Sequence, residues 1–185
     1  DAAILFADIL LVPDALGMDV WFEEGEGPKL NSILGGFNLQ KLRDPEDIHE
    51  KLYPIYQTVK NLSSELPPET TLIGFAGAPW TLYRYMSGIH STLQLDHKQA
   101  QYVMERLTHY VTQHLVAQIK AGCDTVQIFD SWASDIYISH LVPYCFNPTV
   151  KIVDHIRKYY PEVGIIAFPR LIGNEIKNFS IWTDP

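Results

Sequence analysis

Four short stretches of the chain are almost continuously apolar and rich in β-branched or aromatic residues. They span residues 3–8, 71–76, 124–130 and 163–168. Apolar runs of this length and composition predict strands that are covered on both faces, as in a parallel sheet.

Segments with helical spacing of apolar residues lie between these runs. One predicted helix starts at Asp44-Pro45 and ends before Pro67, because Asp is a good N-cap and Pro suits the first turn. A second runs from about Asp96 to Ala121, with Gly122 as its stop. A third begins at Asn147-Pro148 and ends before Pro161. The Gly-rich segment 17–40 predicts a hairpin-like excursion with a short strand at Met18–Phe22.

Alternating strands and helices imply right-handed crossovers and a parallel sheet. An open doubly wound sheet and a (β/α)8 TIM barrel both satisfy this pattern. The open sheet is usually accompanied by a glycine-rich phosphate loop, and neither GxGxxG nor GxxxxGK[ST] follows any predicted strand. A complete barrel takes about 250 residues. The pattern therefore predicts one α/β domain over residues 1–185, with part of a barrel as one of two architectures.

Composition narrows the class of protein. Hydrophobic residues make up 46% of the chain and charged residues 19%, ordinary values for a folded domain. A net charge of −8 disfavours nucleic-acid binding, and no apolar stretch reaches membrane-spanning length. The chain starts with Asp1 and shows no signal peptide, so we expect the natural N-terminus to lie further upstream.

The cysteines and histidines show no metal-binding spacing. Cys123 and Cys145 form no CxxC pair and are expected to be reduced thiols in a cytoplasmic protein. His109 and His114 are five positions apart and no HExxH is present, so a zinc site is not expected. Three further histidines on predicted helices are expected to be solvated: His49, His97 and His155.

Ligands of β/α proteins bind beyond the carboxyl ends of the strands. The residues at those ends are Asp8, Phe75, the turn Gly77–Trp80, Asp130 and Ser131. Judged by its position alone, an Asp at the end of a strand is expected to be a helix cap or a turn residue rather than a ligand-binding residue. Asp130 is left open between an orienting residue and a structural cap, and Trp80 is expected to be a packing anchor.

Three blocks of the sequence resemble the uroporphyrinogen decarboxylase family. Residues 1–16 are similar to the family's "DAAI-F-DIL---AL" block, and Leu72 to Met86 to its "LIGFAGAPWTL--YM" block. Residues 126–133 are similar to its "-Q-F-S-A" block, and Gly25-Glu26-Gly27-Pro28 also fits. The blocks occur in the family's order and spacing.

The resemblance implies a (β/α)8 barrel, of which this chain represents a part, and a homodimer. It implies removal of CO₂ from the four acetate side chains of uroporphyrinogen III to give coproporphyrinogen III, in heme biosynthesis, with no cofactor or metal. The substrate is a small-molecule tetrapyrrole. By the same resemblance the catalytic residues are Asp8 and Tyr85, and the substrate-binding residues are Asp8, Phe75, Tyr85 and Ser131. Without the match, Tyr85 is expected to be a half-buried packing residue.

The chain also departs from the family pattern. The family's arginine-bearing segment precedes Asp1 and its C-terminal histidine lies beyond Pro185; the regions 87–95 and 168–185 are short. Arg84 is assigned no role. Two alternatives stay open: a corrinoid- or thiol-dependent methyltransferase of the same superfamily, and a non-catalytic tetrapyrrole-binding copy. The first is disfavoured because neither Cys123 nor Cys145 has a His two positions earlier, as the zinc motif of those relatives requires.

Overall fold

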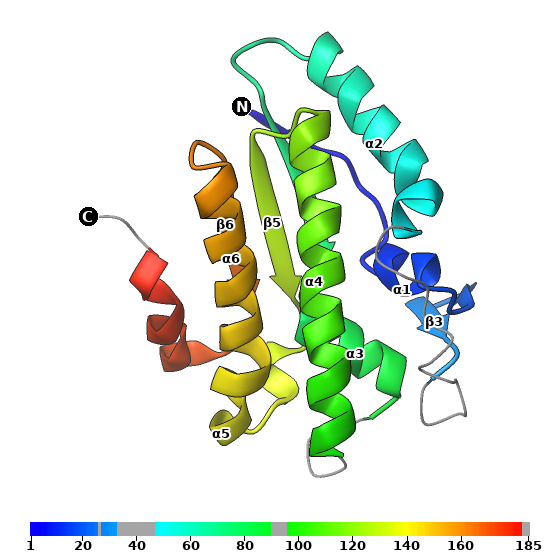
Figure 1. Ribbon diagram of the computed structural model, residues 1–185, viewed down its shortest axis with the longest axis vertical. Coiled ribbons are helices and arrows are strands. Elements are labelled where there is room, and N and C mark those ends of the chain that lie inside the picture. Colours follow the sequence, from blue (N-terminus) through cyan, green and yellow to red (C-terminus); the bar gives the residue numbers. More distant parts are fainter. Residues whose placement is uncertain (26, 33–46, 90–95, 183–185) are drawn as a thin grey trace.

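A four-stranded parallel sheet forms the centre of the protein (Figure 1). The structure is a computed structural model that describes residues 1–25, 27–32, 47–89 and 96–182. The strand order is β1-β4-β5-β6, with β1 Ala2–Ile4, β4 Thr71–Gly77, β5 Thr125–Asp130 and β6 Gly164–Pro169. All neighbouring strands in it run parallel. All four predicted strands are present, three of them within a residue or so of their predicted bounds.

The predicted excursion after the first strand is an antiparallel hairpin. Its strands are β2 Val20–Glu23 and β3 Gly27–Leu30. A short helix that the sequence pattern did not predict, α1 Leu11–Ala15, separates β1 from this hairpin.

The predicted helices are present. Helix α4 spans His97–Ala121, with the Asp96 carboxylate accepting hydrogen bonds from Lys98 N and Gln99 N. It ends at Gly122, whose φ of +119° is the left-handed conformation that glycine adopts most readily. The other helical segments are α2 Ile48–Glu65, α3 Pro79–Ser87, η3 Ala133–Asp135, α5 Ile138–Leu141, the π-helical turn η4 Val142–Phe146, α6 Asn147–Tyr159 and η5 Gly173–Trp182. The predicted start of α2 at Asp44-Pro45 lies outside the described residues.

Helices α2, α4 and α6 cover one face of the sheet (Figure 1). Because side chains alternate between the two faces of a strand, Val126 and Ile128 of β5 both point into this core and are fully buried. Gly74 of β4 points the same way: a Cβ there would lie 2.7 Å from Gln118 Oε1 and 2.8 Å from Cys123 Sγ. The helices therefore pack directly onto the middle of the sheet.

The opposite face of the sheet is apolar but open at its edges. Exposed fractions are 47% for Ile4, 40% for Ile166 and 46% for Phe168. The prediction that all four strands are covered on both faces is thus wrong for the edge strands β1 and β6. The continuous apolar run indicated that both faces are apolar, but in the described ranges no helix covers the second one.

The first strand ends earlier than predicted, at Ile4 instead of residue 8. A side chain from α4 takes the hydrogen bonds that a longer β1 would make. Gln118 Oε1 accepts from Phe75 N at 3.0 Å, and Gln118 Nε2 donates to Phe75 O at 2.9 Å. With the edge of β4 already paired, the chain after Ile4 leaves the sheet, and Asp8 lies in a turn rather than at a strand end.

Candidate functional site at the carboxyl edge of the sheet

Asp8 belongs to the turn that leads from β1 into α1. Its Oδ1 accepts a hydrogen bond from Leu10 N at 2.6 Å, and its carbonyl accepts one from Leu11 N at 3.2 Å. The carboxylate therefore performs the turn-capping role that its position favoured. Asp8 is half-buried. Among the described residues, the other carboxylate oxygen of Asp8 is without a hydrogen-bond donor.

Gly77 places the Asp8 turn against the carboxyl end of β4. A Cβ at Gly77 would lie 3.3 Å from both Cβ and O of Ile9, and 2.8 Å from a methyl carbon of Leu82. The missing side chain lets the turn approach the strand closely. Asp8 is therefore held at the same edge of the sheet as the end of β4, although Asp8 and Gly77 are 69 positions apart in the sequence.

Phe75 lies in a row of three aromatic rings on the uncovered face of the sheet. Its ring meets Phe129 edge to face at a centroid distance of 5.6 Å, and Phe129 meets Phe168 in the same manner at 5.9 Å. Phe75 is 7% exposed, whereas Phe168 at the sheet edge is half open to solvent. The row forms an apolar wall across β4, β5 and β6.

Tyr85 and Ser131 are linked through Trp132. The ring of Tyr85 packs edge to face against Trp132 at 5.9 Å, and Ser131 directly precedes Trp132. Both Tyr85 and Ser131 are half-buried. Of the four predicted site residues, Tyr85 and Ser131 are thus connected: Tyr85 contacts Trp132, which is the next residue after Ser131. Among the described contacts, none joins the Asp8 carboxylate directly to Phe75, Tyr85 or Ser131.

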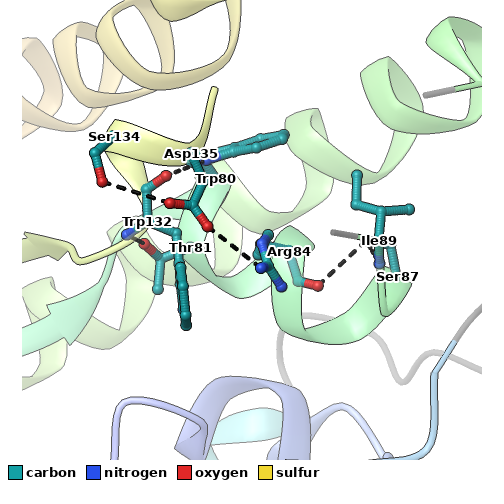
Figure 2. A network of polar contacts seen from close by, with 8 residues as sticks. All are labelled: Trp80, Thr81, Arg84, Ser87, Ile89, Trp132, Ser134 and Asp135. Carbon is teal, nitrogen blue, oxygen red and sulfur yellow. Dashed lines mark hydrogen bonds and ion pairs between the residues drawn. The ribbon is translucent and has the colours of Figure 1, made fainter. Parts of the chain in front are cut away.

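The backbone of Trp132 is held by α3 (Figure 2). Thr81 Oγ1 accepts from Trp132 N at 3.2 Å, and Trp80 Nε1 donates to Trp132 O at 3.0 Å. Trp80 is 1% exposed, so it packs in the core as expected and also fixes the turn after β5. Both the backbone N–H and the backbone C=O of Trp132 are therefore hydrogen-bonded to side chains of α3, which holds the segment that carries Ser131 and Trp132.

Asp130 orients this turn from inside the core. It is 3% exposed, and its Oδ1 accepts from Thr81 Oγ1 at 2.7 Å. The same Thr81 oxygen accepts from Trp132 N. Burial raises the pKa of Asp130 to about 6, against the opposing effect of its hydrogen bonds with Thr81 and Cys145. Asp130 thus acts through Thr81 on the position of Trp132.

Buried polar atoms without a partner gather at this end of the sheet. In the described part of the chain, the buried side-chain nitrogens and oxygens that lack a hydrogen bond are Arg84 Nε, Asp130 Oδ2, Trp132 Nε1 and His140 Nδ1. Asp130 is the last residue of β5, and the other three belong to segments that follow the carboxyl ends of β4 or β5. Such atoms are rare in native proteins, and each calls for an explanation such as strain, a bound water or ion, or a functional role. The sequence pattern gave no signal for Arg84, Trp132 or His140.

Of the three helix histidines predicted to be solvated, His97 is exposed, whereas His49 and His155 are half-buried. His49 Nδ1 lies 3.3 Å from Tyr56 Oη, and His97 Nδ1 lies 2.8 Å from Tyr144 Oη. His114 is 3% exposed and lies 3.0 Å from Gln118 Nε2, and burial lowers its pKa to about 4. Both cysteines are buried and neither is in a disulfide. Within the described ranges, no group of three or more His, Cys, Asp and Glu side chains is arranged to hold a metal ion.

One cavity lies away from this edge, on the helical side. It has a volume of about 490 Å³ between α4 and α6, and Met104, Thr108, Tyr144, Pro148 and Lys151 are among the residues that line it. None of the predicted site residues lines it. The candidate site is instead an open edge, as expected for one part of a barrel wall.

Comparison with known proteins supports one family. The family model for uroporphyrinogen decarboxylase matches residues 1–179. Uroporphyrinogen decarboxylases of Cereibacter sphaeroides and Ruegeria pomeroyi are 41% and 43% identical to this chain over 189 aligned residues, which cover 97% of the chain. The chain spans about half of each relative's length, 55% in both cases.

A solved structure gives the same fold. A methyltransferase from Methanosarcina mazei superposes with a TM-score of 0.75 and 14% sequence identity, over 97% of this chain and 54% of the methyltransferase. Together with the family match, this confirms the predicted α/β fold with part of a barrel represented. No helix in the described ranges has the length and apolarity needed to cross a bilayer.

Proposed function

The chain belongs to the uroporphyrinogen decarboxylase family, and from this premise we propose that the complete protein converts uroporphyrinogen III to coproporphyrinogen III. The reaction removes CO₂ from four acetate side chains in heme biosynthesis. One structural observation carries the proposal: half-buried Asp8 keeps one carboxylate oxygen without a protein donor at the sheet edge where ligands of this fold bind.

The chemistry suits a carboxylate in this place. Loss of CO₂ from an acetate leaves an electron pair, and a pyrrole ring protonated at carbon accepts that pair. The substrate thus supplies its own electron sink, and we propose that no cofactor is required. A carboxylate beneath the macrocycle accepts charge-assisted hydrogen bonds from several pyrrole N–H groups. Its attraction grows as the ring becomes cationic, so it lowers the barrier.

The other predicted residues fit supporting roles. Phe75 and its row of aromatic rings offer an apolar wall for a bulky macrocycle. Tyr85 would donate a hydrogen bond to a substrate carboxylate; in the described structure it makes no hydrogen bond with Asp8, which weighs against a role in orienting Asp8. Ser131 would donate to another substrate carboxylate. We further propose, from the family alone, that the complete protein is a cytoplasmic homodimer.

The Asp8→Asn variant of the complete protein tests the mechanism. Asn keeps an oxygen for Leu10 N, so the turn before α1 is retained while the charge is lost. We expect uroporphyrinogen turnover, measured as anaerobic CO₂ release in the dark, to fall by about 10²–10³-fold, the effect of losing one electrostatic transition-state contact. The matched control is Asp14→Asn, which removes a nearby carboxylate that pairs with Lys51 at 2.7 Å.

The same assay separates the alternatives. CO₂ release from wild-type protein without added metal supports the decarboxylase. Zinc-dependent methyl transfer supports the methyltransferase, and tetrapyrrole binding without turnover supports a binding copy. Near-normal turnover by Asp8→Asn, with the Asp14→Asn control intact, removes Asp8 from the mechanism.

A further inference from the structure

Arg84 lies on α3 at the carboxyl edge of the sheet, directly before Tyr85. Its guanidinium carbon lies 4.3 Å from the centroid of the Trp132 indole, and its side chain is 13% exposed. Figure 2 shows the guanidinium beside Trp132 and facing Asp135. A planar cation held on an aromatic face is fixed in orientation. Since α3 holds the Trp132 backbone at two points, this platform is rigid.

The hydrogen-bonding capacity of Arg84 is little used. Its one described ion pair, from Nη2 to Asp135 Oδ2, measures 3.3 Å, longer than the 2.7–2.9 Å typical of charge-assisted bonds. Arg84 Nε is buried, and none of the described residues accepts from it. Arg106, by contrast, donates to two tyrosine hydroxyls, and Arg157 to two backbone carbonyls.

A mostly buried guanidinium whose donors are largely unpaired by the described residues favours an anionic partner. Burying a cation is costly unless hydrogen bonds and an opposite charge compensate it. The guanidinium fork matches a carboxylate, which can accept two parallel N–H bonds. Asp135 compensates only in part, because its carboxylate is 34% exposed and bonds to Arg84 through one oxygen.

We infer that Arg84 binds one carboxylate of the tetrapyrrole substrate, and that Asp135 is the resident counter-ion which this carboxylate displaces. The inference rests on the proposed function, because that function supplies a ligand with carboxylates at its rim. Arg84 is a binding residue in this scheme. It provides a local positive charge at the site of a protein whose net charge is −8.

The test uses the complete protein and two fluorescent probes, uroporphyrin I with eight carboxylates and coproporphyrin I with four. We expect Arg84→Gln to raise the Kd for uroporphyrin about tenfold, because a hydrogen-bonded charge pair is lost. Arg84→Lys keeps the charge but loses the planar fork, and we expect about a threefold rise. The effect of both should shrink at high salt.

The Asp135→Asn variant distinguishes substrate binding by Arg84 from a purely structural role of Arg84. Removing the competing carboxylate should lower the Kd about threefold, since the substrate no longer displaces a charged partner. Arg106→Gln, on the outer helix α4, is the control for net charge and should change the Kd by less than about twofold. Thermal unfolding of each variant checks that it is folded.

Two results overturn the inference: an unchanged Kd for folded Arg84→Gln and Arg84→Lys, or weaker binding by Asp135→Asn. If the wild-type protein releases no CO₂ from uroporphyrinogen and binds neither porphyrin, the proposed function fails, and the inference fails with it. If the wild type binds and decarboxylates while the Arg84 variants match it, only the inference fails.

Discussion

The helix-covered side of the sheet and its carboxyl edge differ in how completely their polar groups are paired. On the covered side, buried Gln118 bonds to both backbone groups of Phe75 and contacts His114, which in turn contacts Tyr56. At the carboxyl edge, Arg84, Asp130 and Trp132 each keep a buried polar atom without a described partner. Within the described residues, the polar groups named on the covered side are therefore paired, whereas several at the edge are not, and we propose that Arg84 among them binds a ligand.

The two regions also differ in how burial shifts the pKa of their titratable side chains. On the covered side, burial keeps His114 neutral by lowering its pKa to about 4. At the edge, burial raises the pKa of Asp130 to about 6, so this carboxyl ionises near neutral pH at a cost to stability. The two regions thus respond to pH in opposite directions.

Among substitutions of polar side chains, the largest effect on stability is expected from Gln118→Leu. The substitution leaves Phe75 N, Phe75 O and His114 Nε2 buried without their partner, so unfolding free energy should fall by about 3 kcal/mol. Urea denaturation measures it. Gln101→Leu is the same change at an exposed position of α4 and should stay within about 0.5 kcal/mol. Equal losses from both variants would contradict the pairing argument.

The Asp130→Asn variant should change how stability depends on pH. Because the pKa of Asp130 is raised on folding, the folded protein holds its proton more tightly than the unfolded chain, and stability falls as pH rises from about 4 to about 6. The upper limit of this loss is about 3 kcal/mol, since one pKa unit corresponds to about 1.4 kcal/mol.

Urea denaturation from pH 4 to 8 compares the two proteins. The wild type should lose stability relative to Asp130→Asn between pH 4 and 6, and the difference should be constant above pH 7. His114→Gln is the partner experiment. A His whose pKa is lowered on folding costs stability as pH falls from 6.5 towards 4. The wild type should therefore lose stability on the acid side, and His114→Gln should not show this loss. Parallel pH curves for wild type and Asp130→Asn would refute the raised pKa.

Gly74 and Gly77 offer a matched pair on one strand. Gly74→Ala places a Cβ against Gln118 and Cys123, so we expect a loss of stability of about 2 kcal/mol. Gly77→Ala instead pushes on Leu82 and on the Ile9 segment beside Asp8. We expect a smaller loss of stability, of about 1 kcal/mol, with a larger fall in uroporphyrinogen turnover. Thermal unfolding and CO₂ release distinguish the two; a reversed order would contradict the division between the two regions.

The smallest effect is expected at Phe6, in the segment between β1 and α1. Phe6→Ser removes a ring that is 90% exposed, so unfolding free energy should change by less than about 0.5 kcal/mol. Self-association of the 185-residue chain, measured by sedimentation, should decrease because an exposed apolar side chain is lost. Leu72→Ser, at a residue 1% exposed in the covered core, is the contrasting variant and should be strongly destabilising.

Local pattern determined much of this protein. The apolar runs identified the four strands, and the spacing between Asp96 and Gly122 defined α4, because helix caps and periodicity depend on neighbours in sequence. The sequence blocks identified the family and placed Asp8, Phe75, Tyr85 and Ser131 near strand ends. Their roles stay predictions.

Tertiary structure alone decided where β1 ends and what surrounds the site. Gln118 completes the edge of β4 from a helix 43 positions away, and so releases the chain that carries Asp8. Arg84 meets Trp132 and Asp135 only because α3 packs against the turn after β5. Contacts of this kind join residues far apart in the chain, and no local periodicity encodes them. The sequence therefore set the elements and their chemistry, while packing between elements decided which polar atoms are left unpaired.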